Sequence, residues 1–215
     1  IPIAHYVFSQ ILRWNKRIDH HIEYQQSKNW APIAGDGELT NKTLVILGYG
    51  GIGSQVAKIG KAFGMRVTGI RRNPQDDEHA DEVLGLDRFE ELLPLTDYLV
   101  LSLPDSSQTR DIINADILEK LNSSGMIINV GRGTAINEDD LTHALNDGKI
   151  AAAALDATKV EPLDANSSLW MAKNCLMSAH DSAHSLLSLE RAFELFFQNI
   201  KNIKNGDQIV NLYSE

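Results

Sequence analysis

The segment at residues 48–53 constrains the fold of this chain more than any other feature of the sequence. It follows a wholly apolar run, residues 43–47, of the kind that forms a strand buried on both faces. It also opens a stretch in which apolar residues recur at helical spacing, from Ile52 to Phe63. A strand, a G-x-G-x-x-G turn and a helix in this order are typical of a dinucleotide-binding unit. The six residues are Gly48, Tyr49, Gly50, Gly51, Ile52 and Gly53.

Three of the four glycines of this segment have distinct expected purposes. Gly48 permits the tight turn, Gly50 lets a pyrophosphate approach the backbone, and Gly53 lets the helix pack closely on the strand. The first turn of the helix supplies unpaired N–H groups and a positive dipole end to the phosphates. The alternative is a glycine turn that serves packing alone. The strand before the segment and the helix after it favour the phosphate site.

Six short apolar runs have the length of buried strands. They are residues 43–47, 66–70, 98–103, 126–130, 151–155 and 174–178. Helical patterns lie before, between and after them, from an opening helix at 2–18 to a long final helix with its apolar stripe from Leu186 to Ile203. Strands that alternate with helices predict the α/β class, here a Rossmann-like doubly wound parallel sheet with helices on both faces.

The connecting segments carry further local signals. Asn114 is expected to cap a helix that reaches Leu121, and Asn137 with Asp140 resembles a capping box for a helix to Asn146. Pro94 interrupts a short helical piece at 89–96. Two polar stretches are expected to form loops: the acidic cluster at 76–82, and the Gly- and Pro-containing end of residues 20–39.

The end of the second predicted strand bears on the choice of nucleotide. An NAD site usually has an acidic residue there that binds the ribose 2′-hydroxyl. This chain has Arg71, followed by Arg72. An arginine fork can bind a 2′-phosphate that a carboxylate would repel. NADP(H) is therefore favoured, whereas NAD(H) stays usable if Arg71 stacks on the adenine or faces solvent.

Composition argues against several classes of protein. The chain has 215 residues with 20 basic and 29 acidic side chains, a net charge of −9, which argues against a nucleic-acid partner. No apolar run approaches the roughly 18 residues of a membrane span. The one cysteine, Cys175, cannot form an internal disulfide, and this fits a reducing, cytoplasmic compartment. The length suits one large domain, or one domain and part of a second.

Three polar residues follow three successive predicted strands. Arg132 comes after the fourth strand, Glu161 after the fifth and His180 after the sixth. Ligands of an open α/β sheet bind at the carboxyl ends of its strands. An arginine can bind a substrate carboxylate, and a histidine held by a carboxylate can exchange a proton with a hydroxyl. Any one of these residues alone is more often structural, but their order behind a dinucleotide turn indicates a catalytic set.

The chain resembles the D-isomer-specific 2-hydroxyacid dehydrogenases. The similarity covers nearly the whole chain and is carried by GYGGIGSQVAKIGKAFGMRV, INVGRGTAINEDDLTHAL and AALDATKVEPLDANSSLW. The resemblance implies hydride transfer between a nicotinamide cofactor and a small 2-oxo or 2-hydroxy acid. It implies that Arg132 binds the substrate, that His180 is the general acid/base and that Glu161 is its partner. It also implies further cofactor contacts, with Val130, Gly131 and Asp156 beside the nicotinamide, Leu103 and Pro104 beside the adenosine, and Thr109 near the phosphates.

The segment around His180 departs from the family's usual Thr-Pro-His-Ile-Ala-Gly. Here Ala179 replaces the proline, Asp181 follows the histidine, and Ala183 replaces the glycine. A second hypothesis is therefore a nucleotide-binding or redox-sensing regulator of the same family that does not catalyse the reaction. No metal is expected, since His180 and His184 are spaced i, i+4 but the glutamate of a helical zinc motif is absent.

The resemblance also suggests a domain division. Residues 1–205 would form the nucleotide-binding domain, which in this family assembles as a homodimer. The opening helix would pack there or serve the dimer. Residues 206–215 would be the tail of a substrate domain whose N-terminal body is absent from this sequence. Selection among 2-oxo acids would depend largely on that absent body.

Overall fold

The computed structural model describes residues 1–33 and 37–210. The chain divides into two compact units: Ile1 with residues 3–182, and Pro2 with the segment from Ala183 onward. The division therefore falls before the last helix, whereas the sequence suggests a boundary at residue 205. Residues 34–36 of the polar stretch and residues 211–215 of the predicted tail lie outside the described residues.

The first unit is built on one parallel sheet of seven strands, in the order β3-β2-β1-β4-β5-β6-β7. Every neighbouring pair is parallel, which confirms the predicted α/β, Rossmann-like fold. All six predicted strands form, with ends that shift by at most two residues. The strands are β1 (Thr43–Leu47), β2 (Arg66–Ile70), β3 (Glu82–Leu84), β4 (Tyr98–Leu101), β5 (Met126–Asn129), β6 (Ala152–Leu155) and β7 (Cys175–Met177).

The register brings the carboxyl ends of the strands level with one another. Leu47 pairs with Ile70 on one side and with Leu101 on the other. Leu101 pairs with Asn129, and Asn129 pairs with Leu155. The loops that begin after these residues therefore emerge along one edge of the sheet. Arg71, Arg132, Glu161 and His180 all follow strands that end at this edge.

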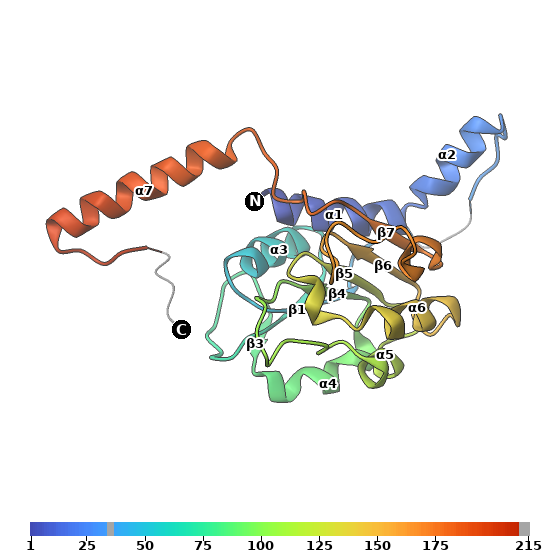
Figure 1. Ribbon diagram of the computed structural model, residues 1–215, viewed down its shortest axis with the longest axis horizontal. Coiled ribbons are helices and arrows are strands. Elements are labelled where there is room, and N and C mark those ends of the chain that lie inside the picture. The colour runs from blue at the N-terminus through green and yellow to red at the C-terminus, as the bar shows by residue number, and fades with distance from the viewer. Residues whose placement is uncertain (34–36, 211–215) are drawn as a thin grey trace. The chain divides into compact units, whose positions relative to one another are not determined.

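Helices cover both faces of the sheet, as predicted (Figure 1). One buried cluster joins the sheet to α4, α5 and α6, and the other joins it to α1 and α3. Burial of these apolar stripes is what holds the short helices on the sheet. The helices of this unit are α1 (Pro2–Asn15), α2 (Ile18–Gln26), α3 (Gly51–Ala62), α4 (Phe89–Leu92), α5 (Ala115–Lys120) and α6 (Glu138–Asn146).

Three local expectations were wrong. The predicted helix at 2–18 ends at Asn15, because Arg17 has a left-handed backbone (φ 54°) and a separate helix, α2, begins at Ile18. The predicted acidic loop runs into a short strand, β3, because Glu82 begins the pairing that extends the sheet beyond β2. Asn137 caps α6 as expected, but the Asp140 carboxylate accepts from the Ala115 N–H (3.0 Å), so no capping box forms.

The second unit contains the long final helix, α7 (Ser188–Asn205), two residues later than the apolar stripe begins. It ends at Gly206, whose positive φ of 73° is typical of a helix C-terminus. Its large apolar side chains, Phe193, Phe196 and Phe197 among them, are exposed. Within residues 1–33 and 37–210, none of the helices combines the length and apolar character needed to cross a membrane.

Candidate nucleotide and catalytic site

The glycine turn between β1 and α3 requires glycine at its first position. Gly48 has a φ of 100°, and a Cβ there would lie 2.7 Å from the Ser102 carbonyl oxygen. Ser102 follows β4 and donates its hydroxyl to the Gly48 carbonyl (2.7 Å). Sequence reasoning missed Ser102, although its place directly after the strand beside β1 is the signal that could have found it.

The backbone of the turn leaves three N–H groups for a ligand. The amides of Gly48 and Tyr49 both donate to the Ile70 carbonyl, and helical bonding starts only with the Ser54 amide. The amides at 51–53 lie in the first turn, where a helix offers no acceptor. A Cβ at Gly50 or Gly51 would meet open space. The arrangement therefore fits an anion at this end of α3.

Tyr49 and Gly53 of the motif serve packing. The Tyr49 ring is 3% exposed and lies against Gly69 of β2, where a Cβ would overlap the ring. Burial raises the pKa of the Tyr49 hydroxyl to about 12, with Asp77 adding to the shift. A Cβ at Gly53 would lie 3.1 Å from the Ile46 side chain, so Gly53 sets the close approach of α3 to β1. The buried Tyr49 ring thus packs the glycine turn against β2.

The two arginines after β2 have different surroundings. Arg71 is half-buried, and its amide donates to the Leu84 carbonyl of β3. Arg72 is exposed and donates from Nη2 to Oε1 of Gln108 (3.0 Å). Because β1 lies between β2 and β4, this contact joins the loops on either side of the glycine turn. Arg71 has no such partner among the hydrogen bonds of the described residues.

The loop after β4 is closed by its own hydroxyl groups. Thr109 donates its Oγ1 proton to the Pro104 carbonyl (2.7 Å) and accepts from the Ser106 amide (3.0 Å). Leu103, at the start of this loop, lies directly against Gly131, where a Cβ would be 2.7 Å from the Leu103 amide nitrogen. The predicted adenosine and phosphate residues are thereby brought beside the loop that carries Arg132.

A buried asparagine shapes the loop that presents Arg132. Asn129, 0% exposed, accepts from the Gly131 amide (3.0 Å) and donates to the Arg132 carbonyl (3.0 Å). Gly133 then packs so tightly that a Cβ would overlap the Thr158 carbonyl. Arg132 itself is exposed. Sequence reasoning missed Asn129 and Gly133 as site residues, although both belong to the Asn-Val-Gly-Arg-Gly segment.

His180 and Glu161 meet in the way the resemblance implies. Nδ1 of His180 lies 2.8 Å from Oε2 and 3.1 Å from Oε1 of Glu161. The Thr158 amide donates to the same carboxylate (3.0 Å). Partial burial opposes ionisation of Glu161, but the hydrogen bonds from His180 and Thr158 outweigh it and hold the pKa of this carboxyl below its usual range. An ionised Glu161 fixes the proton on Nδ1 and leaves Nε2 for proton exchange.

Asp156 holds the backbone that carries His180. Its side chain is 2% exposed, and its Oδ1 accepts from the Ser178 hydroxyl (2.7 Å) and from the Asp181 (3.0 Å) and Ser182 (3.1 Å) amides. Its backbone carbonyl accepts from the His180 amide (2.9 Å). The carboxylate is therefore directed at the segment 178–182.

A cavity of about 170 Å³ collects the predicted catalytic residues, Arg132, Glu161 and His180. Its lining includes four polar residues that sequence reasoning missed. Asp105 accepts from the Thr134 hydroxyl (3.0 Å), and Lys159 lies 3.3 Å from Asp111. The sequence signal for Asp105 is its place after Leu103 and Pro104, and Lys159 lies within the Asp156–Glu161 segment. The four missed residues are Asp105, Thr134, Thr158 and Lys159.

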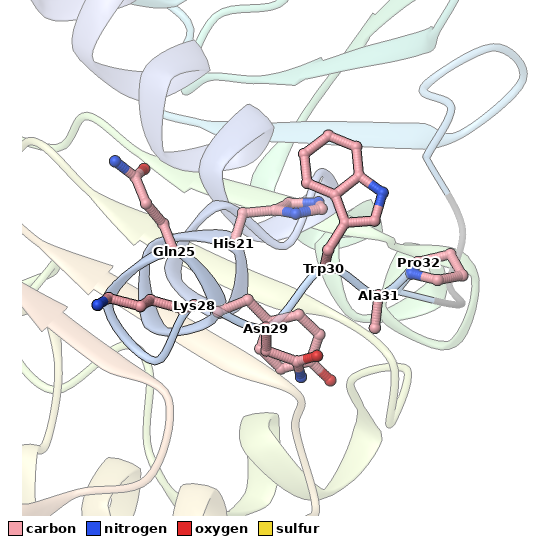
Figure 2. A pocket seen from close by; sticks show the side chains of 8 residues that line it. His21, Gln25, Lys28, Asn29, Trp30, Ala31 and Pro32 are labelled. Atoms are coloured by element: carbon pink, nitrogen blue, oxygen red, sulfur yellow. The ribbon is translucent and has the colours of Figure 1, made fainter.

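A larger hollow, of about 700 Å³, is lined by α2 and the segment after it (Figure 2). Its walls include His21, Tyr24 and Trp30, and Trp30 is fully exposed. None of the predicted catalytic or cofactor residues lines it. Among residues 1–33 and 37–210, no group of three His, Cys, Asp or Glu side chains is arranged to hold a metal ion.

Comparison with known proteins agrees with this geometry. Residues 8–182 match the family model described as D-isomer specific 2-hydroxyacid dehydrogenase, NAD binding domain. The chain is 33% identical to a glyoxylate reductase of Aeropyrum pernix over 97% of this chain and 65% of that protein. The curated relatives compared are covered over 56% to 67% of their length, so the chain spans about three fifths of them.

The solved structures that resemble this chain are members of the same family. A D-isomer specific 2-hydroxyacid dehydrogenase family protein of Aeromonas salmonicida superposes with a TM-score of 0.90 at 32% identity, over 99% of this chain and 68% of that one. An NADPH-dependent glyoxylate/hydroxypyruvate reductase of Sinorhizobium meliloti, solved with NADP and sulfate, gives 0.88 at 26% identity, over the same shares. The chain therefore belongs to the D-isomer specific 2-hydroxyacid dehydrogenase family and contains that family's NAD binding domain.

Proposed function

We propose that the protein transfers a hydride from NADPH to a small 2-oxo acid to form a D-2-hydroxy acid, or, in the reverse direction, from the D-2-hydroxy acid to NADP⁺. The observation that carries the proposal is the His180–Glu161 contact in one cavity with Arg132, at the edge of the sheet where the glycine turn also lies. The proton donor His180, the anion-binding Arg132 and the phosphate site at the glycine turn then all lie at the carboxyl edge of the sheet. The names of the relatives, glyoxylate and hydroxypyruvate reductases, support this substrate class.

The residues present fit a dinucleotide. The turn offers open space at Gly50 and Gly51, and the first-turn amides of α3 supply donors for the pyrophosphate. Arg71, at the end of β2, supplies a cation where the ribose 2′-phosphate of NADP(H) would lie. Three solved neighbours contain NADP or NADPH, which favours the same nucleotide here. When bound, the nicotinamide ring supplies or accepts the hydride at its C4 atom.

The side chains of this chain provide the rest of the chemistry. The Arg132 guanidinium binds the substrate carboxylate and orients the 2-oxo group. As negative charge develops on the oxo oxygen, Nε2 of His180 donates a proton and Arg132 stabilises the charge that remains. Glu161 stabilises the imidazolium before transfer and keeps the ring in place through Nδ1. In the opposite direction, neutral His180 accepts the hydroxyl proton.

A single substitution in the full-length protein tests the assignment. His180→Gln removes the imidazole nitrogen proposed to exchange the proton, while it keeps a polar side chain of similar size. Reduction of glyoxylate or hydroxypyruvate should fall by about 100-fold or more, with NADPH binding retained. His143→Gln, on α6 and outside the cavity, is the matched control. Unchanged turnover in the His180 variant would defeat the proposal. The absence of any turnover in the unmodified protein would favour a redox-sensing regulator.

We further propose that two copies of the chain associate through the α1–α2 region. The structure describes all of α2, and none of its residues is buried. Ile18 and Ile22 of α2 are exposed, and so is Trp30, which lines the hollow in Figure 2. An apolar surface of this kind on a short, uncovered helix suits a second copy. The Ile22→Lys, Trp30→Lys double variant should be monomeric by light scattering, whereas Leu95→Lys, exposed elsewhere, should stay dimeric. A dimer in both variants would contradict this.

A further inference from the structure

A chain of two short hydrogen bonds connects the first helix to the loop that carries His180. The Tyr6 hydroxyl of α1 lies 2.7 Å from Oγ of Ser178, just after β7. The same Oγ lies 2.7 Å from Oδ1 of Asp156, just after β6. The sequence does not predict this contact, because 172 residues separate Tyr6 from Ser178.

The direction of both hydrogen bonds follows from the chemistry of the groups. A carboxylate only accepts, so Ser178 donates its single hydroxyl proton to Asp156. The Ser178 oxygen is then free to accept, and Tyr6 donates to it. Asp156 is 2% exposed, so water does not compete for its oxygens. Each donor in the chain therefore has one acceptor, and the loss of Ser178 Oγ would leave both neighbours incompletely bonded.

Asp156 binds three successive backbone amides, the first of them that of His180. Its carbonyl accepts from the His180 amide, and its carboxylate accepts from the amides at 181 and 182. His180 has a left-handed backbone, with φ of 54°, which is unfavourable for a non-glycine residue. Such a conformation persists only where its surroundings impose it. Here the surroundings that impose it are the backbone and side chain of Asp156.

We propose that Tyr6 and Ser178 are positioning residues that keep the Asp156 carboxylate oriented, and through it hold the His180 ring on Glu161. The proposal rests on the proposed acid/base function of His180. It adds that the first helix, which leads into α2, contributes to the geometry of a catalytic loop far away in sequence. Neither Tyr6 nor Ser178 touches Glu161 among the hydrogen bonds of the described residues, so both act through Asp156.

The test uses Ser178→Ala, Ser178→Thr and Tyr6→Phe in the full-length protein. Ser178→Ala should lower kcat roughly tenfold, because a small displacement of a proton donor slows transfer steeply, while the Kd for NADPH stays within about twofold. Ser178→Thr keeps the hydroxyl and should restore kcat. Tyr6→Phe, a milder change that retains the ring, should lower kcat by a smaller factor.

Tyr98→Phe is the matched structural control. Asn15, on the same helix α1, donates to the Tyr98 hydroxyl (3.3 Å) in a buried contact away from Asp156. This variant therefore removes a hydroxyl that binds α1 without reaching the loop of His180. If Ser178 and Tyr6 merely stabilise the fold, the Tyr98 variant should lower the melting temperature and kcat as they do. We expect it to affect the melting temperature alone.

A readout independent of turnover separates the two proposals. The Nδ1 proton of ¹⁵N-labelled His180, hydrogen-bonded to Glu161, should give an NMR signal that Ser178→Ala shifts or broadens and Tyr98→Phe leaves in place. An unchanged signal and unchanged kcat in Ser178→Ala would overturn the positioning proposal. If His180→Gln itself retains turnover, the proposed function fails, whatever the signal shows.

Discussion

Nδ1 of His180 lies 2.8 Å from Oε2 of Glu161, although the two residues follow different strands and their side chains stay 44% and 40% exposed. The contact is thus partly accessible from solvent. Arg132 lines the same cavity. Because the pair is partly solvated, its effect is expected on proton transfer more than on the stability of the fold.

Glu161→Gln tests the electrostatic part of this pair. The amide keeps the shape of the side chain but no longer stabilises an imidazolium, so kcat/KM for a 2-oxo acid should fall by about 10- to 100-fold. Steady-state kinetics with NADPH at fixed pH provide the measurement. Glu119→Gln, on α5 and paired with Lys149, is the control. Equal kinetics in wild type and Glu161→Gln would remove Glu161 from the mechanism.

The lowered pKa of Glu161 also predicts a dependence of stability on pH. The folded-state pKa lies below the ordinary value of 4.5, because hydrogen bonds from His180 and Thr158 outweigh partial burial. Folding is therefore stabilised by this group above the unfolded-state pKa, and the stabilisation is lost as the pH falls through the folded value. The difference in melting temperature between wild type and Glu161→Gln should shrink below pH 4.5. A melting-temperature difference that grows on acidification would contradict a lowered pKa of Glu161 in the folded protein.

The fold follows from local patterns that need no tertiary information. The apolar run at 43–47, the glycine turn after it and the Asn114 and Asn137 caps each determine their own element, and the structure has all of them. Elements without a long apolar pattern were missed. β3 has three residues and forms because it pairs with β2, and α2 buries nothing that a periodicity could reveal.

The candidate site was predictable to the extent that its residues follow strands. Strand ends placed Arg132, Glu161 and His180 on one edge, and the register confirms that edge. Residues that act through packing or buried hydrogen bonds were not predictable in this way. Tyr6 is the clearest case, because 172 residues separate it from Ser178 and no spacing in the sequence reports their contact. Ser102 and Asn129 do stand at strand ends, but that position does not reveal the hydrogen bonds that they make to the Gly48 carbonyl and to the Gly131 amide.

Gly133→Ala tests how the Arg132 loop is held. A Cβ at this position would overlap the Thr158 carbonyl, so the loops after β5 and β6 must separate. Such overpacking typically costs about 1–3 kcal/mol, which urea denaturation measures. Gly51→Ala, whose Cβ would enter open space in the first turn of α3, should leave the free energy of unfolding unchanged or raise it. Equal stability of the two variants would show that the close contact is absent.

Arg71 and Arg72 should differ in their effect on nucleotide choice. Arg71 lies at the end of β2 with its guanidinium uncommitted among the described hydrogen bonds, whereas Arg72 donates to Gln108. Arg71→Ala should therefore weaken NADPH binding by about 1–3 kcal/mol and NADH binding far less, because only NADPH carries the 2′-phosphate. Arg72→Ala should show a smaller difference between the two nucleotides. Fluorescence titration of both nucleotides gives the Kd values, with Arg66→Ala, exposed at the opposite end of β2, as the control. Equal losses of affinity for NADPH and NADH in Arg71→Ala would show that Arg71 does not bind the 2′-phosphate and instead stacks on the adenine or faces solvent. NAD(H) would then be as good a cofactor as NADP(H).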